Sequence, residues 1–176
     1  MNTILLPDGT AIPKVGQGTW HLGEEPHKRA SELEALQWGI ENGLTLIDTA
    51  EMYGEGASEE LVGEAIRPFQ RDQLFLVSKV YPWNAGKNQI FDSCQNSLDR
   101  LGTDYLDLYL LHWRGSVPLR ETVSCMEQLK AQGRACASFP ANGRSRLLCC
   151  RRTQLHACAG FAGLRPGAGR HLCHPA

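Results

Sequence analysis

Two patterns of apolar positions alternate along residues 1–133 of the chain. Short, nearly continuous apolar runs predict buried strands, whereas apolar residues spaced three or four positions apart predict helices. The predicted strands are 15–20, 44–50, 75–80 and 105–113, and the predicted helices are 28–42, 58–66, 90–101 and 118–130. Ahead of them, two short apolar segments flank the turn sequence Pro7-Asp8-Gly9, which predicts a β-hairpin.

This order of elements predicts a parallel sheet. Strands that alternate with helices form right-handed βαβ units, and the run at 105–113 is apolar enough to be covered on both faces. Two architectures fit, an open doubly wound sheet and a (β/α)8 barrel. Four strand–helix units amount to half of such a barrel.

The pattern changes after Gly133. All 19 acidic residues precede it, whereas residues 134–176 contain seven Arg, five of the seven Cys, and no Asp, Glu, Lys, Ile, Val, Met, Trp or Tyr. Such a composition is far from ordinary globular usage. We therefore expect a domain over 1–133 and, over 134–176, a disordered tail that is foreign to it and has no fifth strand. A shift of reading frame would generate a tail of this kind.

Composition also bears on partners and location. The net charge of −1 argues against nucleic acid or an anionic membrane as a partner. No apolar stretch is long enough to span a membrane, and the first residues lack the pattern of a signal peptide, so we expect a cytoplasmic protein. We expect no metal site either, because the tail residues fit no zinc spacing: His156, Cys158, His171, Cys173 and His174.

Four residues at or just after predicted strand ends suggest chemistry, namely Asp48, Tyr53, Lys79 and His112. Carboxyl ends of parallel strands meet at one face of a barrel. An ammonium close to a phenol stabilises the phenolate, a carboxylate provides the counter-charge that a buried Lys needs, and an imidazole can orient a carbonyl. Each residue alone also has an ordinary structural interpretation, but four compatible groups at one face predict a device that protonates a carbonyl.

Several segments resemble the aldo-keto reductase family. They are VGQGTWHLGE, IDTAEMYGEGASEELVGEAI, FLVSKVYPWN and YLDLYLLHW, and the resemblance covers about residues 3–133. Among the members of the family, the chain resembles the bacterial NADPH-dependent ones most. The resemblance implies the N-terminal half of a (β/α)8 TIM barrel, an α/β fold, with an N-terminal β-hairpin.

The resemblance also implies roles for individual residues. Tyr53 would be the general acid, Lys79 would make it a stronger acid, Asp48 would pair with Lys79, and His112 would orient the substrate. The reaction would be hydride transfer from NADPH to a small aldehyde or ketone. Asp48, with Thr19 and Trp20, would lie on the cofactor side, and the absence of a GxGxxG motif fits a family that holds its cofactor without a Rossmann domain.

The loops after three strands each carry a tryptophan, Trp20, Trp83 and Trp113, and family members wall the substrate pocket with such aromatics. The alternative is an aromatic rim that merely covers the barrel mouth. Later strands supply most of the cofactor site in the family, and nothing after Gly133 matches them. We therefore expect impaired activity. One alternative to this impaired enzyme is an inactive fragment or decayed gene product that self-associates through open barrel edges. Another alternative is an open nucleotide-binding sheet.

Overall fold

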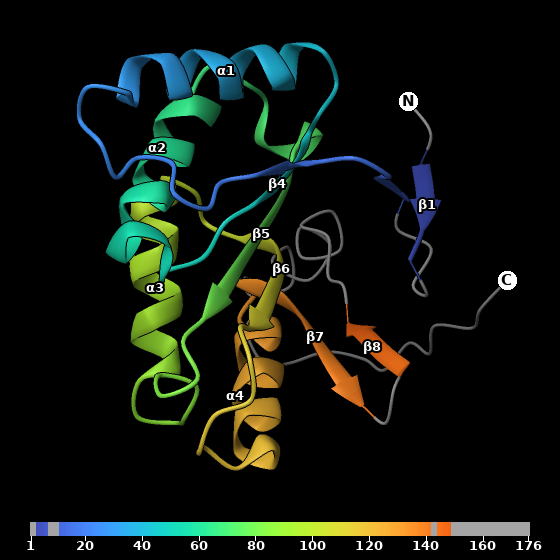
Figure 1. Cartoon of the computed structure of the whole chain (residues 1–176). Helices are drawn as coiled ribbons and strands as arrows, with labels where there is room; N and C mark the ends of the chain where they lie inside the picture. Colours follow the sequence, from blue (N-terminus) through green and yellow to red (C-terminus); the bar gives the residue numbers. More distant parts are fainter. Residues whose placement is uncertain (1–2, 7–10, 142–143, 149–176) are drawn as a thin grey trace, which may run out of the picture.

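The computed structural model describes residues 3–6, 11–141 and 144–148 (Figure 1). Its main element is a six-stranded sheet in the order β3-β4-β5-β6-β7-β8. A separate two-stranded hairpin precedes it, formed by β1 (Thr3–Leu5) and β2 (Ala11–Pro13), with Ile4 opposite Ile12. The predicted hairpin is therefore confirmed.

The first five strands of the sheet run parallel, and the alternation of strands and helices predicted the first four of them. They are β3 (Gln17–Gly18), β4 (Leu46–Asp48), β5 (Phe75–Val80), β6 (Leu106–Leu111) and β7 (Ala135–Ala141). Neighbouring pairs are parallel from β3 to β7, and β8 (Arg144–Leu148) then pairs antiparallel with β7.

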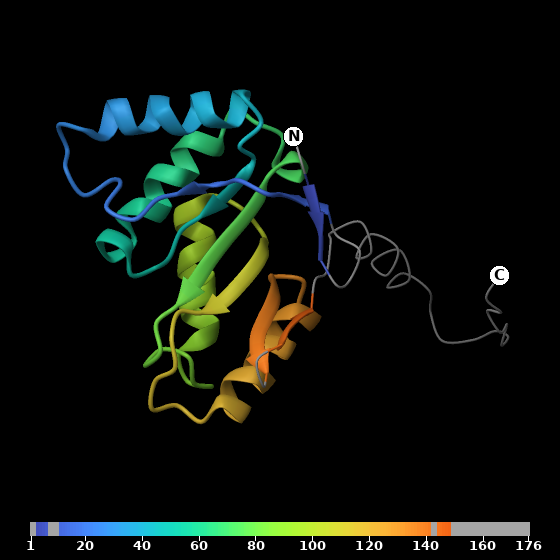
Figure 2. The same ribbon diagram turned by 45° about the vertical axis from the view of Figure 1, so that its right-hand side comes forward.

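Four helices alternate with these strands and lie along one side of the sheet, as Figures 1 and 2 show. They are α1 (Arg29–Glu41), α2 (Ala57–Ile66), α3 (Ile90–Leu101) and α4 (Leu119–Ala131), joined by the short 3-10 helices η1 (Tyr53–Gly56) and η2 (Arg71–Gln73). Gly102, which has φ +63°, follows the last residue of α3, and Pro118 precedes α4.

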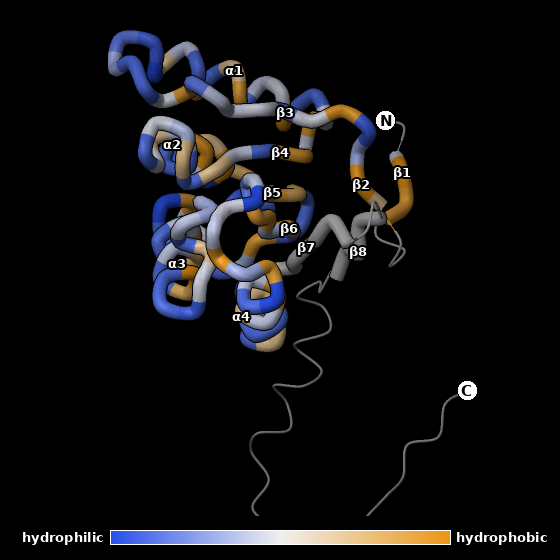
Figure 3. Tube along the Cα trace, turned by 60° about the horizontal axis from the view of Figure 1, so that its bottom comes forward, coloured by the Kyte–Doolittle hydropathy of each residue, from blue (hydrophilic) through white to orange (hydrophobic). Residues whose placement is uncertain are grey.

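The hydrophobic core lies between the helices and the sheet. Its fully buried side chains come from both layers, and the largest are Tyr109, Ile47, Leu61, Leu76, Ile90, Leu101, Leu106, Met126 and Leu129. The other face of the sheet has no helix against it in the described part of the chain, and the hairpin lies on that side (Figure 3). This is the arrangement of half a (β/α)8 barrel.

The expectation that no strand follows Gly133 is wrong for residues 135–141 and 144–148. Ala135 lies opposite Leu106 and Ser138 opposite Leu110, so β7 extends the sheet in parallel with β6. This segment has no β-branched residue. Its strand form therefore follows from pairing with the edge of β6, because tertiary context decides β-structure more than intrinsic preference does. The rest of the predicted disordered tail, 149–176, lies outside the described residues, and the division into two domains stays a prediction.

Candidate active site

Lys79 lies at the centre of the candidate site. It is the fifth residue of β5, and the sheet register places Asp48 of β4 beside Val77 on the same face. The Nζ atom of Lys79 donates hydrogen bonds to the carboxylate of Asp48 at 2.9 Å, to the carbonyl of Thr49 at 3.0 Å and to the phenol oxygen of Tyr53 at 3.1 Å. Three acceptors satisfy the three N–H groups of the ammonium.

This arrangement leaves the proton of Tyr53 free to point elsewhere. A phenol oxygen can accept one hydrogen bond and donate another. Because Lys79 already donates to Tyr53, the phenol hydrogen cannot be directed at Lys79 and is available to a group in front of the site. The Lys79 side chain is 13% exposed and that of Asp48 is 39% exposed, so the ion pair lies at the boundary between core and solvent.

His112 is the first residue after β6, and its backbone N–H donates to the carbonyl of Val80 at 3.1 Å. Its ring faces Tyr53 edge-on, with ring centroids 5.7 Å apart and an interplanar angle of 77°. Burial lowers the pKa of His112, the charge of Lys79 lowers it further, and Asp48 partly opposes the change. A neutral imidazole has one donor and one acceptor nitrogen, and Nδ1 is buried without a protein partner in the described structure.

The structure therefore brings all four predicted residues together. Asp48 and Lys79 come from adjacent strands, Tyr53 from the loop after β4, and His112 from the end of β6. The arrowheads of β5 and β6 in Figure 1 mark this end of the sheet. The sequence predicted these residues because each lies at, or shortly after, the carboxyl end of an apolar run.

Aromatic rings continue the site along its edge. Trp20 lies 6.5 Å from Tyr53 between ring centroids, and Trp113 lies 4.7 Å from His112. Trp83 contacts Trp113 edge-on at 6.1 Å. The three tryptophans are 64%, 57% and 43% exposed, in the order Trp20, Trp83 and Trp113, so they do not belong to the core. We call this arc of rings the aromatic rim. It lies at the mouth of the site, as expected both for a wall of a substrate pocket and for an aromatic cover over the barrel mouth.

Sequence reasoning missed Tyr81, which belongs to the same rim. Its ring stacks on Trp83 with centroids 4.3 Å apart and meets Trp113 edge-on at 6.4 Å. The available signal was its position directly after the apolar run of β5, the same kind of position that identified His112.

Thr19, which the resemblance placed near the cofactor, is fully buried. Its backbone N–H and its hydroxyl both donate to the carbonyl of Asp48, at 3.0 and 3.1 Å. Thr19, which directly follows the short strand β3, thus fixes the backbone of Asp48 at the end of β4. Trp20, the next residue, is exposed and turns toward Tyr53, so the two predicted cofactor residues have different surroundings.

Glu51 is a second residue that sequence reasoning missed. It is buried, and its Oε1 atom accepts hydrogen bonds from the backbone N–H of Tyr81 at 2.6 Å and from Nδ2 of Asn84 at 3.3 Å. Burial raises the pKa of Glu51, and these two hydrogen bonds partly oppose the rise. Glu51 therefore joins the loop of Tyr53 to the loop of Trp83.

The predicted helix 58–66 begins one residue earlier, as α2, and Ser58 lies inside it. Gly56 occupies the N-cap, and the Ser58 hydroxyl points away from the helix to the carbonyls of Thr19 and Leu22, at 2.9 and 2.5 Å. Ser58 sits too far into the helix to cap it, so it ties the start of α2 to the loop after β3 instead.

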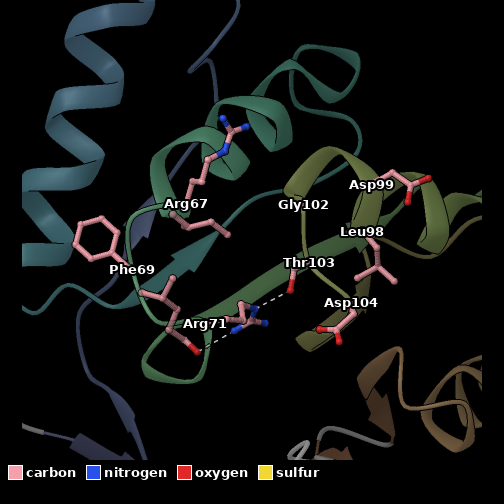
Figure 4. A pocket seen from close by; sticks show the side chains of 10 residues that line it. Arg67, Phe69, Arg71, Leu98, Asp99, Gly102, Thr103 and Asp104 are labelled. Atoms are coloured by element: carbon pink, nitrogen blue, oxygen red, sulfur yellow. Dashed lines mark hydrogen bonds between the residues drawn. The ribbon is translucent and has the colours of Figure 1, made fainter.

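A hollow of about 660 Å³ lies at the opposite end of the sheet (Figure 4). Leu74 and Thr103, which precede β5 and β6, line it together with Phe69 and Arg71. Arg71 donates to Thr103 Oγ1, to the carbonyls of Leu74 and Tyr105, and to the carboxylate of Asp107. The guanidinium is thus occupied by internal partners, and the hollow is separate from the group around Lys79.

The described ranges contain no group of three potential metal ligands and no helix long and apolar enough to cross a membrane. The tail residues weighed as zinc ligands lie outside those ranges, so the absence of a metal stays a prediction.

Comparison with known proteins agrees with the sequence resemblance. The model of the Aldo/keto reductase family matches residues 14–137. Methylglyoxal reductase YeaE from Escherichia coli (strain K12) is 59% identical over 124 residues, which are 70% of this chain and 43% of that protein. Aldo-keto reductase YhdN from Bacillus subtilis (strain 168) is 37% identical over 145 residues, 75% of this chain and 44% of that one.

Solved structures give the same result. An aldo/keto reductase from Klebsiella pneumoniae in complex with NADP and acetate superposes with a TM-score of 0.72 at 56% identity, covering 76% of this chain and 47% of that one. The chain thus spans less than half the length of these relatives. The extent of the family match and the identities leave one conclusion, that this chain belongs to the aldo/keto reductase family.

Proposed function

We propose that the chain reduces a small aldehyde or ketone to its alcohol with NADPH, at a rate well below that of a full-length relative. The observation that supports this best is the position of Lys79, which donates to both Asp48 and Tyr53. Family membership and the name of the E. coli relative, a methylglyoxal reductase, point to the same reaction class.

In the proposed mechanism Tyr53 is the proton donor. Its phenol accepts from Lys79, so its own hydrogen can be donated to the oxygen of a bound carbonyl. The charge on Lys79 favours the phenolate that this transfer leaves behind, and Asp48 holds Lys79 in place. A neutral His112, beside Tyr53, can donate a hydrogen bond to the same carbonyl oxygen and orient it.

When bound, NADPH supplies the hydride. The described residues fit its nicotinamide side, because the half-exposed carboxylate of Asp48 and the exposed ring of Trp20 border the site. We propose that Thr19 acts there indirectly, by holding Asp48. The phosphates are fitted less well, since α2 begins after the Gly54–Gly56 turn but carries Glu60 in its first turn, and a carboxylate there disfavours an anion.

The substrate is proposed to be small because the aromatic rim borders the site on one side. Trp20, Trp83 and Trp113 would contact the apolar part of the substrate, while its carbonyl meets Tyr53. Apolar walls with a few placed polar groups are the usual composition of such pockets. A 2-oxoaldehyde such as methylglyoxal meets both requirements.

The test is loss of NADPH absorbance by the purified chain with methylglyoxal, compared with Tyr53→Phe and with a full-length relative. We expect slow turnover that Tyr53→Phe abolishes. Turnover that survives in Tyr53→Phe would contradict the assigned role of Tyr53. Turnover equal to that of the full-length relative would contradict the proposed impairment.

The second candidate is a non-enzymatic fragment that associates with a second copy of itself. The observations that favour it are the unpaired outer edge of β3 in the described sheet and the exposed apolar residues Leu5 and Val15. Size-exclusion chromatography with NADPH titration separates the candidates. A dimer unaffected by NADPH favours the fragment, and a species that binds NADPH favours the enzyme. The cytoplasmic location stays a prediction.

A further inference from the structure

The loop that carries Tyr53 has an unusual backbone. Gly54, Glu55 and Gly56 have φ angles of +56°, +53° and +100°, so three successive residues after Tyr53 are left-handed. A non-glycine residue such as Glu55 adopts this region at a cost. Such a conformation persists only where the surroundings determine it. Contacts with this loop therefore help to decide where the phenol of Tyr53 lies.

Arg100, in the last turn of α3, is one of the groups that support this loop. A Cβ atom on Gly56 would lie 2.7 Å from both Cδ and Nε of Arg100, so the arginine side chain fills the space under Gly56. The backbone carbonyl of Arg100 is in turn packed against Gly63 of α2. Two glycines of neighbouring helical segments thus touch the same arginine, one its side chain and the other its backbone. The helices α2 and α3 lie next to each other in Figures 1 and 2.

Arg100 also reaches the strand of Lys79 through a buried carboxylate. Its Nε and Nη2 atoms contact Oε2 of Glu59 at 2.7 and 2.6 Å. Oε1 of Glu59 accepts a hydrogen bond of 2.5 Å from the hydroxyl of Ser78, the residue before Lys79 on β5. Glu59 and Ser78 are both fully buried. A carboxylate that is held out of water depends on its partners, so this connection is well determined.

We propose that Arg100 is a positioning residue for the proton transfer, acting through Gly56 on Tyr53 and through Glu59 and Ser78 on Lys79. The arginine touches neither substrate nor cofactor. What it sets is the contact of 3.1 Å between Lys79 Nζ and the Tyr53 oxygen, because it packs against the loop of one and is bonded to the strand of the other. A displacement of about 1 Å would break that hydrogen bond. This inference rests on the proposed role of Tyr53 as proton donor.

Three variants test it. Arg100→Met keeps most of the side-chain volume but leaves Glu59 unpaired. Arg100→Lys keeps a cation that can reach Glu59. The double variant Glu59→Gln with Arg100→Met removes both charges, so no unpaired charge remains buried. Arg29→Met is the matched control, because Arg29 forms a 2.9 Å ion pair with Glu64, another residue of α2, with both partners more than a third exposed.

The first measurement does not depend on turnover. The NMR signal of the Tyr53 phenol carbon, assigned with Tyr53→Phe, is recorded in each variant under the same conditions. We expect this signal to shift in Arg100→Met relative to the unaltered chain, because the 3.1 Å hydrogen bond from Lys79 Nζ to the Tyr53 oxygen is lost. Arg100→Lys should show a smaller shift, and Arg29→Met should show none. The double variant should regain the thermal stability that Arg100→Met loses. Its Tyr53 signal should nevertheless differ from that of the unaltered chain.

The second measurement is kinetic, and it separates the two proposals. Where the unaltered chain turns over, Arg100→Met should lower kcat about ten- to a hundredfold with KM little changed. A chain without turnover would refute the proposed function, while the Tyr53 signal would still decide the role of Arg100. If Arg100→Met does not fold, Arg100→Lys and the double variant decide. An unchanged Tyr53 signal in those folded variants would overturn the inference.

Discussion

The backbone N–H of Tyr81 donates to Oε1 of Glu51 across 2.6 Å, and this hydrogen bond joins two loops that carry different parts of the site. Glu51 lies two residues before Tyr53, and Tyr81 stacks on Trp83 of the aromatic rim. Tyr53 and the aromatic rim are therefore connected through one buried carboxylate.

Replacing Glu51 by Leu should loosen the loop of Tyr81 while leaving the Tyr53 loop folded. The amide of Tyr81 would lose its acceptor, and its hydrogen exchange should speed up by roughly tenfold, as expected for a lost hydrogen bond to a charged group. Glu51→Gln is the control, since its amide oxygen can still accept from Tyr81. Equal exchange rates in the two variants would show that the carboxylate does not hold this loop.

The same residue predicts a pH dependence of stability. Burial raises the pKa of Glu51 in the folded state, so folding favours its protonated form. The contribution of Glu51 to stability is therefore complete when the pH is below the ordinary glutamate pKa of about 4.3. It is lost as the pH rises through the higher pKa of Glu51 in the folded state. Glu51→Gln should thus gain in melting temperature, relative to the unaltered chain, between pH 4 and pH 7. A difference that does not change with pH would contradict this.

His112 should remain neutral at neutral pH. Burial and the nearby charge of Lys79 lower its pKa below the ordinary value of about 6.5. The stability that the neutral imidazole contributes is fully present when the pH is above the ordinary pKa. It is lost as the pH falls through the lower pKa of His112 in the folded state. An NMR titration of the ring measures this directly. In Lys79→Met the pKa of His112 should rise, and a midpoint that stays unchanged would exclude Lys79 as a cause.

Tyr109→Phe should leave stability unchanged or raise it by up to about 1 kcal/mol. Tyr109 is fully buried in the core, and its hydroxyl has no hydrogen-bond partner within the described ranges. Removing an unsatisfied buried hydroxyl eliminates a desolvation cost while the ring packing stays the same. Urea unfolding of the two chains provides the comparison. A loss of more than 1 kcal/mol would mean that the hydroxyl has a partner, such as a buried water.

The sequence predicted the four central residues because their positions depend on local signals. Asp48, Lys79 and His112 sit where an apolar run ends, and parallel strands bring such ends together. The link between Glu59 and Arg100 left no such signal, since the partners are 41 residues apart and meet only when α2 packs on α3. The strand β7 was missed for a related reason, because its form comes from pairing with β6.

The antiparallel pairing of β8 with β7 has a kinetic consequence. Ala137 to Ala141 are paired with residues 144 to 148, so the β7 edge that a sixth parallel strand would use is already hydrogen-bonded. Any strand arriving there must first displace a paired hairpin arm, and such an exchange passes through a state with broken ladder bonds. Completion of the barrel at this edge would consequently be a slow strand exchange with a barrier set by opening β8, and not a rapid docking of preformed surfaces.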